Sequence, residues 1–146
     1  MTVHMIKLCV GAVSIEDLAE WQAGRLEEAR KATGKAEIWH TTRMEPKRRD
    51  ELMNGGSLYW VIKGVVQVRQ AIVGFRSGAK ADGTPATLVL LAPELVPVRP
   101  VPRRAFQGWR YLEPADAPPD MVKGQADDLA RMPPQMRRDL AELGLI

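Results

Sequence analysis

Residues 58–75 read LYWVIKGVVQVRQAIVGF and contain the strongest β-sheet signal of the chain. Both halves are rich in Val, Ile and aromatic residues, which fit the pleated surface of a sheet. Gly64 lies between the halves and is suited to a bend, a bulge or a tight turn. The pattern predicts strands at 58–63 and 65–75, which pair antiparallel because parallel neighbours need long crossovers.

Upstream of this pair the sequence alternates between strand and helix signals. Ser14, with Asp17 three residues later, is typical of a helix N-cap, and Gly34 is suited to the C-terminal end of a helix of roughly 18 residues. The predicted upstream elements are a strand at 4–10, this helix, a strand at 36–42 and a helix at 47–53 with Pro46 at its first position.

Downstream, a predicted loop at 77–85 precedes a strand at 87–91, and prolines make 93–102 an edge strand or an extended polyproline-like run. A short strand at 109–112, a Pro-rich connector near 113–119 and a short helical C-terminal tail, with helices at 120–131 and 134–143, complete the chain. This order predicts an α+β fold in one domain, residues 1–146. Its sheet is small, mixed and mainly antiparallel, a curled sheet or pseudo-barrel flanked by helices.

The net charge of +3 is unevenly distributed along the chain. Residues 57–112 hold eight Lys/Arg against two Asp/Glu, whereas residues 113–146 hold four against seven. A positive block between neutral and acidic parts indicates an anionic partner for the middle region. The alternative is that the acidic C-terminal part folds back and neutralises the block.

Several classes of location and site are not expected from the sequence. No apolar run approaches the roughly 20 residues of a membrane helix, and the N-terminus lacks the pattern of a signal peptide. Cys9 is the one cysteine, so a reducing cytoplasm is the expected compartment. His4 and His40 form no cluster at metal-ligand spacing, and residues 55–57 lack the Lys-Ser/Thr of a phosphate loop, so neither metal nor cofactor is expected.

The most suggestive functional stretch is 103–111, RRAFQGWRY, which interleaves three arginines with three aromatic residues. Guanidinium groups bind phosphate in a bidentate manner, and an exposed Trp109 or Tyr111 could stack a base. The alternative is that the aromatic residues seal the core while the arginines face water.

Two further groups of polar residues stand out. Residues 42–49 place four cations at or before the start of a helix, where the dipole opposes them, although pairing with nearby acids is an alternative. Arg69 interrupts an apolar strand, so it reaches solvent, pairs with a carboxylate or lines a cleft. The predicted ligand-binding residues are Arg43, Lys47, Arg48, Lys63, Arg69, Gln70, Arg103, Arg104, Trp109, Arg110 and Tyr111.

Short stretches throughout the chain carry a resemblance to a known family: 4–11 (HMIKLCVG), 42–44 with 46–48 (TRM and PKR), 55–64 (GGSLYWVIKG), 69–70 (RQ) and 103–112 (RRAFQGWRYL). They resemble a bacterial family of unknown function found mainly in alphaproteobacteria. This resemblance implies a cytosolic bacterial protein and brings no activity or catalytic residue. The architecture around 59–64 also resembles PUA-like barrels, including ASCH and EVE domains, which implies RNA or nucleotide binding in a cleft.

Three functions follow as hypotheses. The first is a module that binds RNA or a nucleotide through phosphate contacts. The second is a hydrolase or transferase for a nucleoside-like substrate in the same cleft, with Glu45 or His40 as base and Lys63 as electrostatic partner. The third is a protein-interaction module that uses the 93–102 edge or the acidic C-terminal helices.

Overall fold

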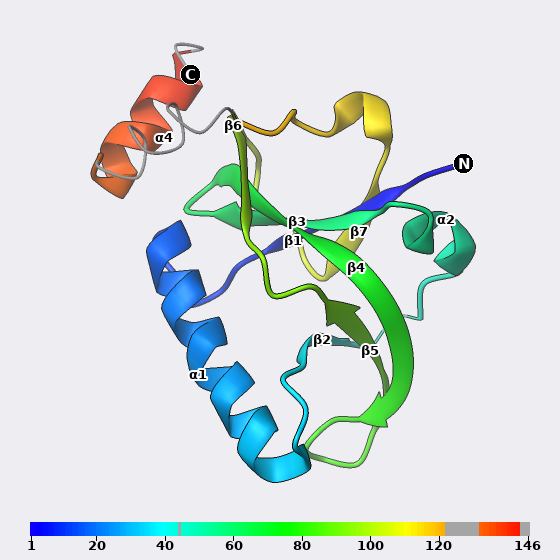
Figure 1. The fold of residues 1–146 in the computed structure, drawn as a ribbon. Helices are drawn as coiled ribbons and strands as arrows, with labels where there is room; N and C mark the ends of the chain where they lie inside the picture. Colours follow the sequence, from blue (N-terminus) through cyan, green and yellow to red (C-terminus); the bar gives the residue numbers. More distant parts are fainter. Residues whose placement is uncertain (44, 122–131, 144–146) are drawn as a thin grey trace.

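The computed structural model describes residues 1–43, 45–121 and 132–143. Within these residues the chain forms a curled, mostly antiparallel sheet of seven strands with helices packed around it (Figure 1). The predicted α+β class is confirmed. The strands are β1 (His4–Leu8), β2 (Ile38–Thr42), β3 (Ser57–Ile62), β4 (Val65–Ala79), β5 (Pro85–Leu91), β6 (Val96–Pro102) and β7 (Trp109–Leu112). The helices are α1 (Ile15–Thr33), α2 (Arg49–Met53), the 3-10 turn η1 (Pro114–Asp116) and α4 (Pro134–Glu142).

The long strand β4 organises the sheet. Its first half pairs with β3 on one side and β6 on the other, and its second half pairs with β5. Because one strand serves two partly different sets of neighbours, the sheet bends along β4, as Figure 1 shows. On the far side of β3, β1 runs parallel to β3, and β7 closes that edge antiparallel to β1.

Two apolar clusters pack on opposite faces of this sheet. The inner face carries the larger cluster, which includes Met5, Leu58 and Trp60 and is covered by Leu18 of α1. The outer face carries a smaller cluster of Ile6, Tyr59, Val61, Val66, Val98 and Leu112. Burial of one large apolar side chain contributes roughly 1.5–3 kcal/mol, so both clusters stabilise the strand register.

Helix α1 follows the expected capping pattern. The Ser14 side chain accepts a hydrogen bond from the Asp17 N–H at 3.1 Å, and Gly34 ends the helix with a positive φ of 80°. Its buried residues Leu18, Gln22 and Ala29 lie on one face. No described helix combines the length and the apolar character that crossing a membrane requires.

The structure corrects several predicted boundaries. β4 extends to Ala79 and β5 begins at Pro85, so the loop expected at 77–85 is a short hairpin turn whose Lys80 and Thr84 are hydrogen-bonded. α2 begins at Arg49 and not at Pro46. In the helix expected at 120–131, Asp120 instead pairs with Val98 as an extended bridge, and residues 122–131 lie outside the described residues.

Candidate functional site

The turn between β3 and β4 forms one end of the sheet. Lys63 and Gly64, its central residues, have φ values of 52° and 77°, and positive φ at both positions is what a type I′ turn requires. Asn, Asp or Gly is usual at such positions, so Lys63 holds its charge there at a conformational cost. The N–H of Arg103 donates to the Gly64 carbonyl at 2.8 Å, which fixes the chain leaving β6 against this turn.

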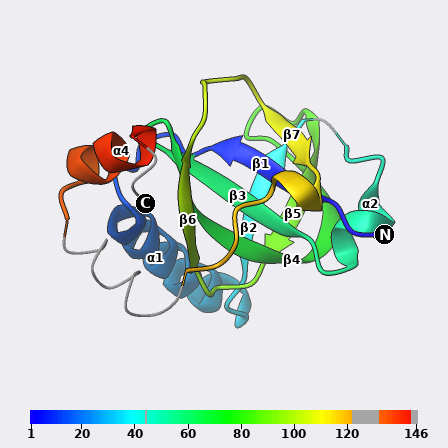
Figure 2. The same cartoon turned by 90° about the horizontal axis from the view of Figure 1, so that it is seen from above.

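A hollow of about 380 Å3 lies beside this turn. Three arginines line it, two from the segment that follows β6 and one from α4, together with Gly64 and Pro102. These arginines are Arg103, Arg104 and Arg138. Figures 1 and 2 show α4 next to β6 on this side of the molecule. The hollow therefore brings three arginine side chains together where the turn, the end of β6 and α4 meet.

The basic region continues along the β6–β7 connection, where two arginines lie close to the Phe106 ring. The Arg103 and Arg110 guanidinium carbons lie 5.7 and 5.1 Å from the centroid of its ring. The ring packs on the outer-face cluster, and Arg110 is exposed. We call Lys63, Arg103, Arg104, Arg110 and Arg138 the arginine surface. In the described part of the chain, Lys63, Arg103, Arg104 and Arg110 form no ion pair with a carboxylate.

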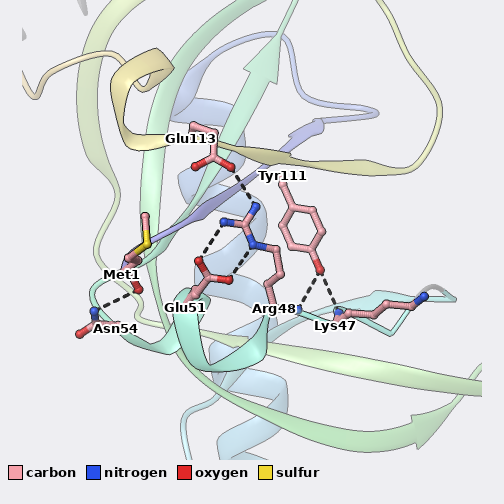
Figure 3. Close-up of polar contacts among 7 residues, drawn as sticks. All are labelled: Met1, Lys47, Arg48, Glu51, Asn54, Tyr111 and Glu113. Carbon is pink, nitrogen blue, oxygen red and sulfur yellow. Dashed lines mark hydrogen bonds and ion pairs between the residues drawn. The ribbon is translucent and has the colours of Figure 1, made fainter.

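Arg48, at the other end of the sheet, is fully engaged. Its guanidinium binds Glu51 through two hydrogen bonds of 2.7 and 2.9 Å and Glu113 through a third of 2.8 Å (Figure 3). The hydrogen bonds from Arg48 hold the pKa of Glu51 below its ordinary value. Tyr111 completes the cluster, because its hydroxyl accepts hydrogen bonds from the N–H groups of Lys47 (2.8 Å) and Arg48 (3.0 Å). Arg48 and Tyr111 thus fasten the segment before α2 to β7.

Arg69 is also held by a carboxylate. It binds Asp120 through two hydrogen bonds of 2.7 Å and donates a third to the Ser57 hydroxyl at 3.0 Å. The bond from Arg69 lowers the pKa of Asp120. Of the roles that the sequence left open for Arg69, the structure shows pairing with a carboxylate.

Gln70 lies in the inner face, fully buried. It exchanges two amide hydrogen bonds of 2.8 Å with Gln22 of α1, accepts a third from the Trp60 indole at 2.8 Å and donates a fourth to the Ala92 carbonyl at 3.0 Å. A buried amide destabilises the fold unless its donors and acceptors are hydrogen-bonded, and those of Gln70 are. Gln70 therefore joins α1 to the sheet.

The structure thus divides the eleven predicted ligand-binding residues. It brings Lys63, Arg103 and Arg104 to the turn end, and Arg110 of β7 shares the Phe106 ring with Arg103. Arg43 and Lys47 are exposed on the segment between β2 and α2, at the opposite end of the sheet in Figures 1 and 2. Trp109 is only 6% exposed and packs edge-to-face on Tyr111 at 4.8 Å, so its ring belongs to the inner core.

The chain from residue 5 to residue 146 matches the family model described as a protein of unknown function, DUF1489. The chain belongs to the DUF1489 family. No curated protein and no solved structure matches it.

The residues considered for acid–base chemistry are not assembled in this DUF1489 protein. Glu45 pairs with Arg49 at 2.6 Å, His40 faces Trp60 in the inner face, and Lys63 lies in the β3–β4 turn. Burial, with Lys7 and Arg25 nearby, lowers the pKa of His40 to about 4, so the ring is neutral at pH 7. Among the described residues, no group of three or more His, Cys, Asp or Glu is arranged to hold a metal ion.

One polar residue of the inner face escaped the sequence reasoning. Lys7 lies in register between Trp60 of β3 and Trp109 of β7. Partial burial of the Lys7 ammonium group lowers its pKa below the ordinary value for lysine. The signal was available, because Lys7 has the same strand parity as Met5 and therefore the inward face, where a cation is unusual.

Proposed function

We propose that this DUF1489 protein binds single-stranded RNA through the arginine surface. The observation that carries the proposal is the group of four cations, Lys63, Arg103, Arg104 and Arg110, which lack a carboxylate partner in the described chain and lie along one connected stretch. Gathering like charges without counter-charges is unfavourable, and a polyanion relieves that cost.

The chemistry of these side chains suits a phosphate backbone. Guanidinium groups offer paired N–H donors that match two phosphate oxygens, and three of the four cations are arginines. The Arg103 and Arg110 guanidinium groups both contact the Phe106 ring, which orders these side chains and reduces the entropy lost when they bind. The architectural resemblance of the region around residues 59–64 to PUA-like barrels, many of which bind RNA, supports the same proposal.

Base stacking has a smaller part in this proposal than the sequence indicated. Trp109 is buried, and the Tyr111 hydroxyl is occupied by two backbone N–H groups. Contacts to the backbone alone carry no sequence information, so binding is expected to be tolerant of sequence and strongly dependent on salt.

Fluorescence anisotropy with short single-stranded and duplex RNA at two salt concentrations tests the proposal. Single-stranded RNA should bind more tightly at the lower salt concentration than at the higher one. Arg103→Ala/Arg104→Ala should reduce the slope of log K against log salt by about 1.4, because each phosphate that the protein neutralises on a single strand accounts for roughly 0.7. The charge-matched control is Lys31→Ala/Lys35→Ala, which removes two exposed lysines of the α1 region. Absence of binding at low salt, or equal reductions in both double variants, contradicts the proposal.

A further inference from the structure

Lys7 and His40 lie on the inner face of the sheet beside the same tryptophan ring. Lys7 is the register partner of Trp60, and the His40 ring packs edge-to-face on Trp60 with 5.7 Å between the ring centroids. In the sheet order, β5 and β4 separate β2, which carries His40, from β3, which carries Trp60. The curl of the sheet therefore brings polar side chains of β1 and β2 to one place in its interior.

Both side chains are short of polar partners within the described residues. The Nε2 atom of His40 is buried and has no hydrogen-bond partner there. Lys7 is half-buried and forms no ion pair with a described carboxylate. Buried polar atoms normally have a partner and partly buried cations normally have a counter-charge, so each group departs from the rule in a way that a bound ligand can remedy.

The electrostatic surroundings of these two groups are positive. Burial lowers the pKa of His40 to about 4, and the charges of Lys7 and Arg25 add to this effect. Burial also lowers the pKa of Lys7, which the charge of Lys80 lowers further and Cys9 raises. None of the causes of these two shifts is a carboxylate. Cations from β1, from α1 and from the end of β4 therefore act on the same part of the interior.

The two outer cations differ from Lys7 because they have contacts of their own. The Arg25 guanidinium lies over the exposed Trp21 ring, 4.5 Å from its centroid. Lys80 acts on Asp82 of its own hairpin turn and lowers the pKa of that carboxyl to a small extent. We therefore assign direct ligand contact to Lys7 and His40, and longer-range attraction to Arg25 and Lys80.

A small oxyanion satisfies these groups together. Its charge pairs with the Lys7 ammonium, and one of its oxygens accepts a hydrogen bond from His40 in the tautomer with the proton on Nε2. The surrounding cations attract it. A cationic ligand would be repelled, and a neutral ligand would leave Lys7 without a counter-charge.

We propose that Lys7 and His40 form a binding site for a small oxyanion, the phosphate or carboxylate group of a small molecule, on the inner face of the sheet. The site is separate from the arginine surface, because the Phe106 ring that Arg103 and Arg110 contact packs on the outer-face cluster. The inference therefore stands or falls independently of RNA binding.

The two histidines of the chain give a direct NMR probe. His4 serves as the internal reference, since its ring packs on Tyr59 of the outer-face cluster and its Nδ1 accepts a hydrogen bond from the Ser57 N–H. Inorganic phosphate and, separately, acetate are titrated at pH 6.5 and constant ionic strength. We expect a saturable shift of the His40 imidazole signals and no change at His4. Saturation by one anion alone identifies a phosphoryl or a carboxylate ligand, and saturation by both identifies a site that accepts either.

The pKa of His40 gives a second readout from the same signals. An anion beside an imidazole favours its charged form, so saturating phosphate should raise this pKa by about one unit. The groups that face His40 are Lys7, Arg25 and the Trp60 ring, with no carboxylate among them, so the rise reports the added anion. A pKa that is the same with and without both anions contradicts contact between His40 and the ligand.

Variants connect the binding to these residues. Lys7→Met keeps an unbranched side chain between the tryptophans and should weaken the anion about tenfold or more. Arg25→Met changes an exposed position, leaves the core intact and should weaken it about twofold. The matched control is Lys31→Met, which removes an exposed cation of the same helix and should change nothing.

Three results overturn the inference. They are equal, non-saturating shifts at His4 and His40, wild-type anion affinity in folded Lys7→Met together with Arg25→Met, and loss of the His40 response in Arg103→Ala/Arg104→Ala. The last result would place the anion on the arginine surface. Each of these results leaves the RNA-binding proposal to its own test.

Discussion

Two sets of arginines in this chain have opposite surroundings. Arg48 and Arg69 each bind carboxylates in bidentate geometry, and in each case one carboxylate comes from the C-terminal third, Glu113 or Asp120. Arg103, Arg104 and Arg110, of the arginine surface, have no such partner in the described chain. The first set therefore joins segments of the fold, and the second set is the one to which we assign RNA binding.

This difference shows why the charge of a segment is a poor guide to its surface. The block 57–112 is strongly basic by count, but Asp120 neutralises Arg69 and Glu37 neutralises Arg76. Asp120, from the acidic part of the chain, pairs with Arg69 of this block, as one interpretation of the sequence allowed, and no described carboxylate forms an ion pair with Arg103, Arg104 or Arg110. The positive charge that remains on the surface therefore depends on which basic side chains lie close to an acidic one.

The largest effect that separates the two sets is on folding stability. Arg69→Met should lower the free energy of unfolding by about 2 kcal/mol, because it removes three hydrogen bonds, two of them to a charged group. Urea unfolding followed by circular dichroism measures this change. RNA affinity of the folded variant should change little.

Arg76→Met is the matched control for that experiment. Arg76 also binds a carboxylate at two points, Glu37 at 3.1 Å, but its side chain is 50% exposed against 25% for Arg69. Exposed ion pairs stabilise little, so the control should unfold close to the wild type. If Arg69→Met lowers RNA affinity as much as Arg103→Ala/Arg104→Ala, the division between the two sets is wrong.

Much of the fold was predictable because its signals are local. The Ser14 and Gly34 caps lie next to the helix they limit, and the high content of Val, Ile and aromatic residues in 58–75 identifies β3 and β4 directly. The predicted boundaries are wrong where a residue distant in sequence determines the local structure. Pro46 was expected to open a helix, but the Tyr111 hydroxyl holds the N–H groups just before α2, and that partner is 64 residues from Lys47.

The candidate site was predictable in part for the same reason. Arg103, Arg104 and Arg110 are close in sequence, so their proximity in space needs little long-range information. The state of Arg69 depends on Asp120, which is 51 residues away, and no local pattern could choose among its three roles. The contribution of α4 to the hollow was equally hidden, since only tertiary packing brings Arg138 beside Arg103.

A smaller difference between the two sets of arginines is expected in the dependence of folding stability on acidic pH. Asp120 and Glu51 have pKa values held below 3.8 and 4.5 by Arg69 and Arg48. A lowered carboxyl pKa contributes stability that is complete above the unfolded value and is lost as the pH falls through the folded value. Stability should therefore fall below about pH 4.5, and the fall should be shallower in Arg69→Met because one of these carboxyls no longer has a shifted pKa.

The control for the acid experiment is Arg103→Ala/Arg104→Ala, measured by the same urea titrations at several pH values. These arginines have no carboxylate partner in the described chain, so their removal should shift the stability curve without changing its shape. A flattened curve in this variant would indicate that a carboxyl group pairs with the arginine surface and would end the contrast between the two sets.

The smallest effect is expected for Arg104→Ala on folding. Arg104 is exposed, and no described carboxylate lies within ion-pair distance of it, so the free energy of unfolding should change by less than about 0.5 kcal/mol. The same substitution should weaken RNA binding severalfold and reduce the salt slope by about 0.7. Urea unfolding and anisotropy on one preparation measure both quantities. A variant that is weaker in both stability and affinity would show that Arg104 acts through the fold, whereas weaker affinity alone identifies a side chain that the fold leaves available for a ligand.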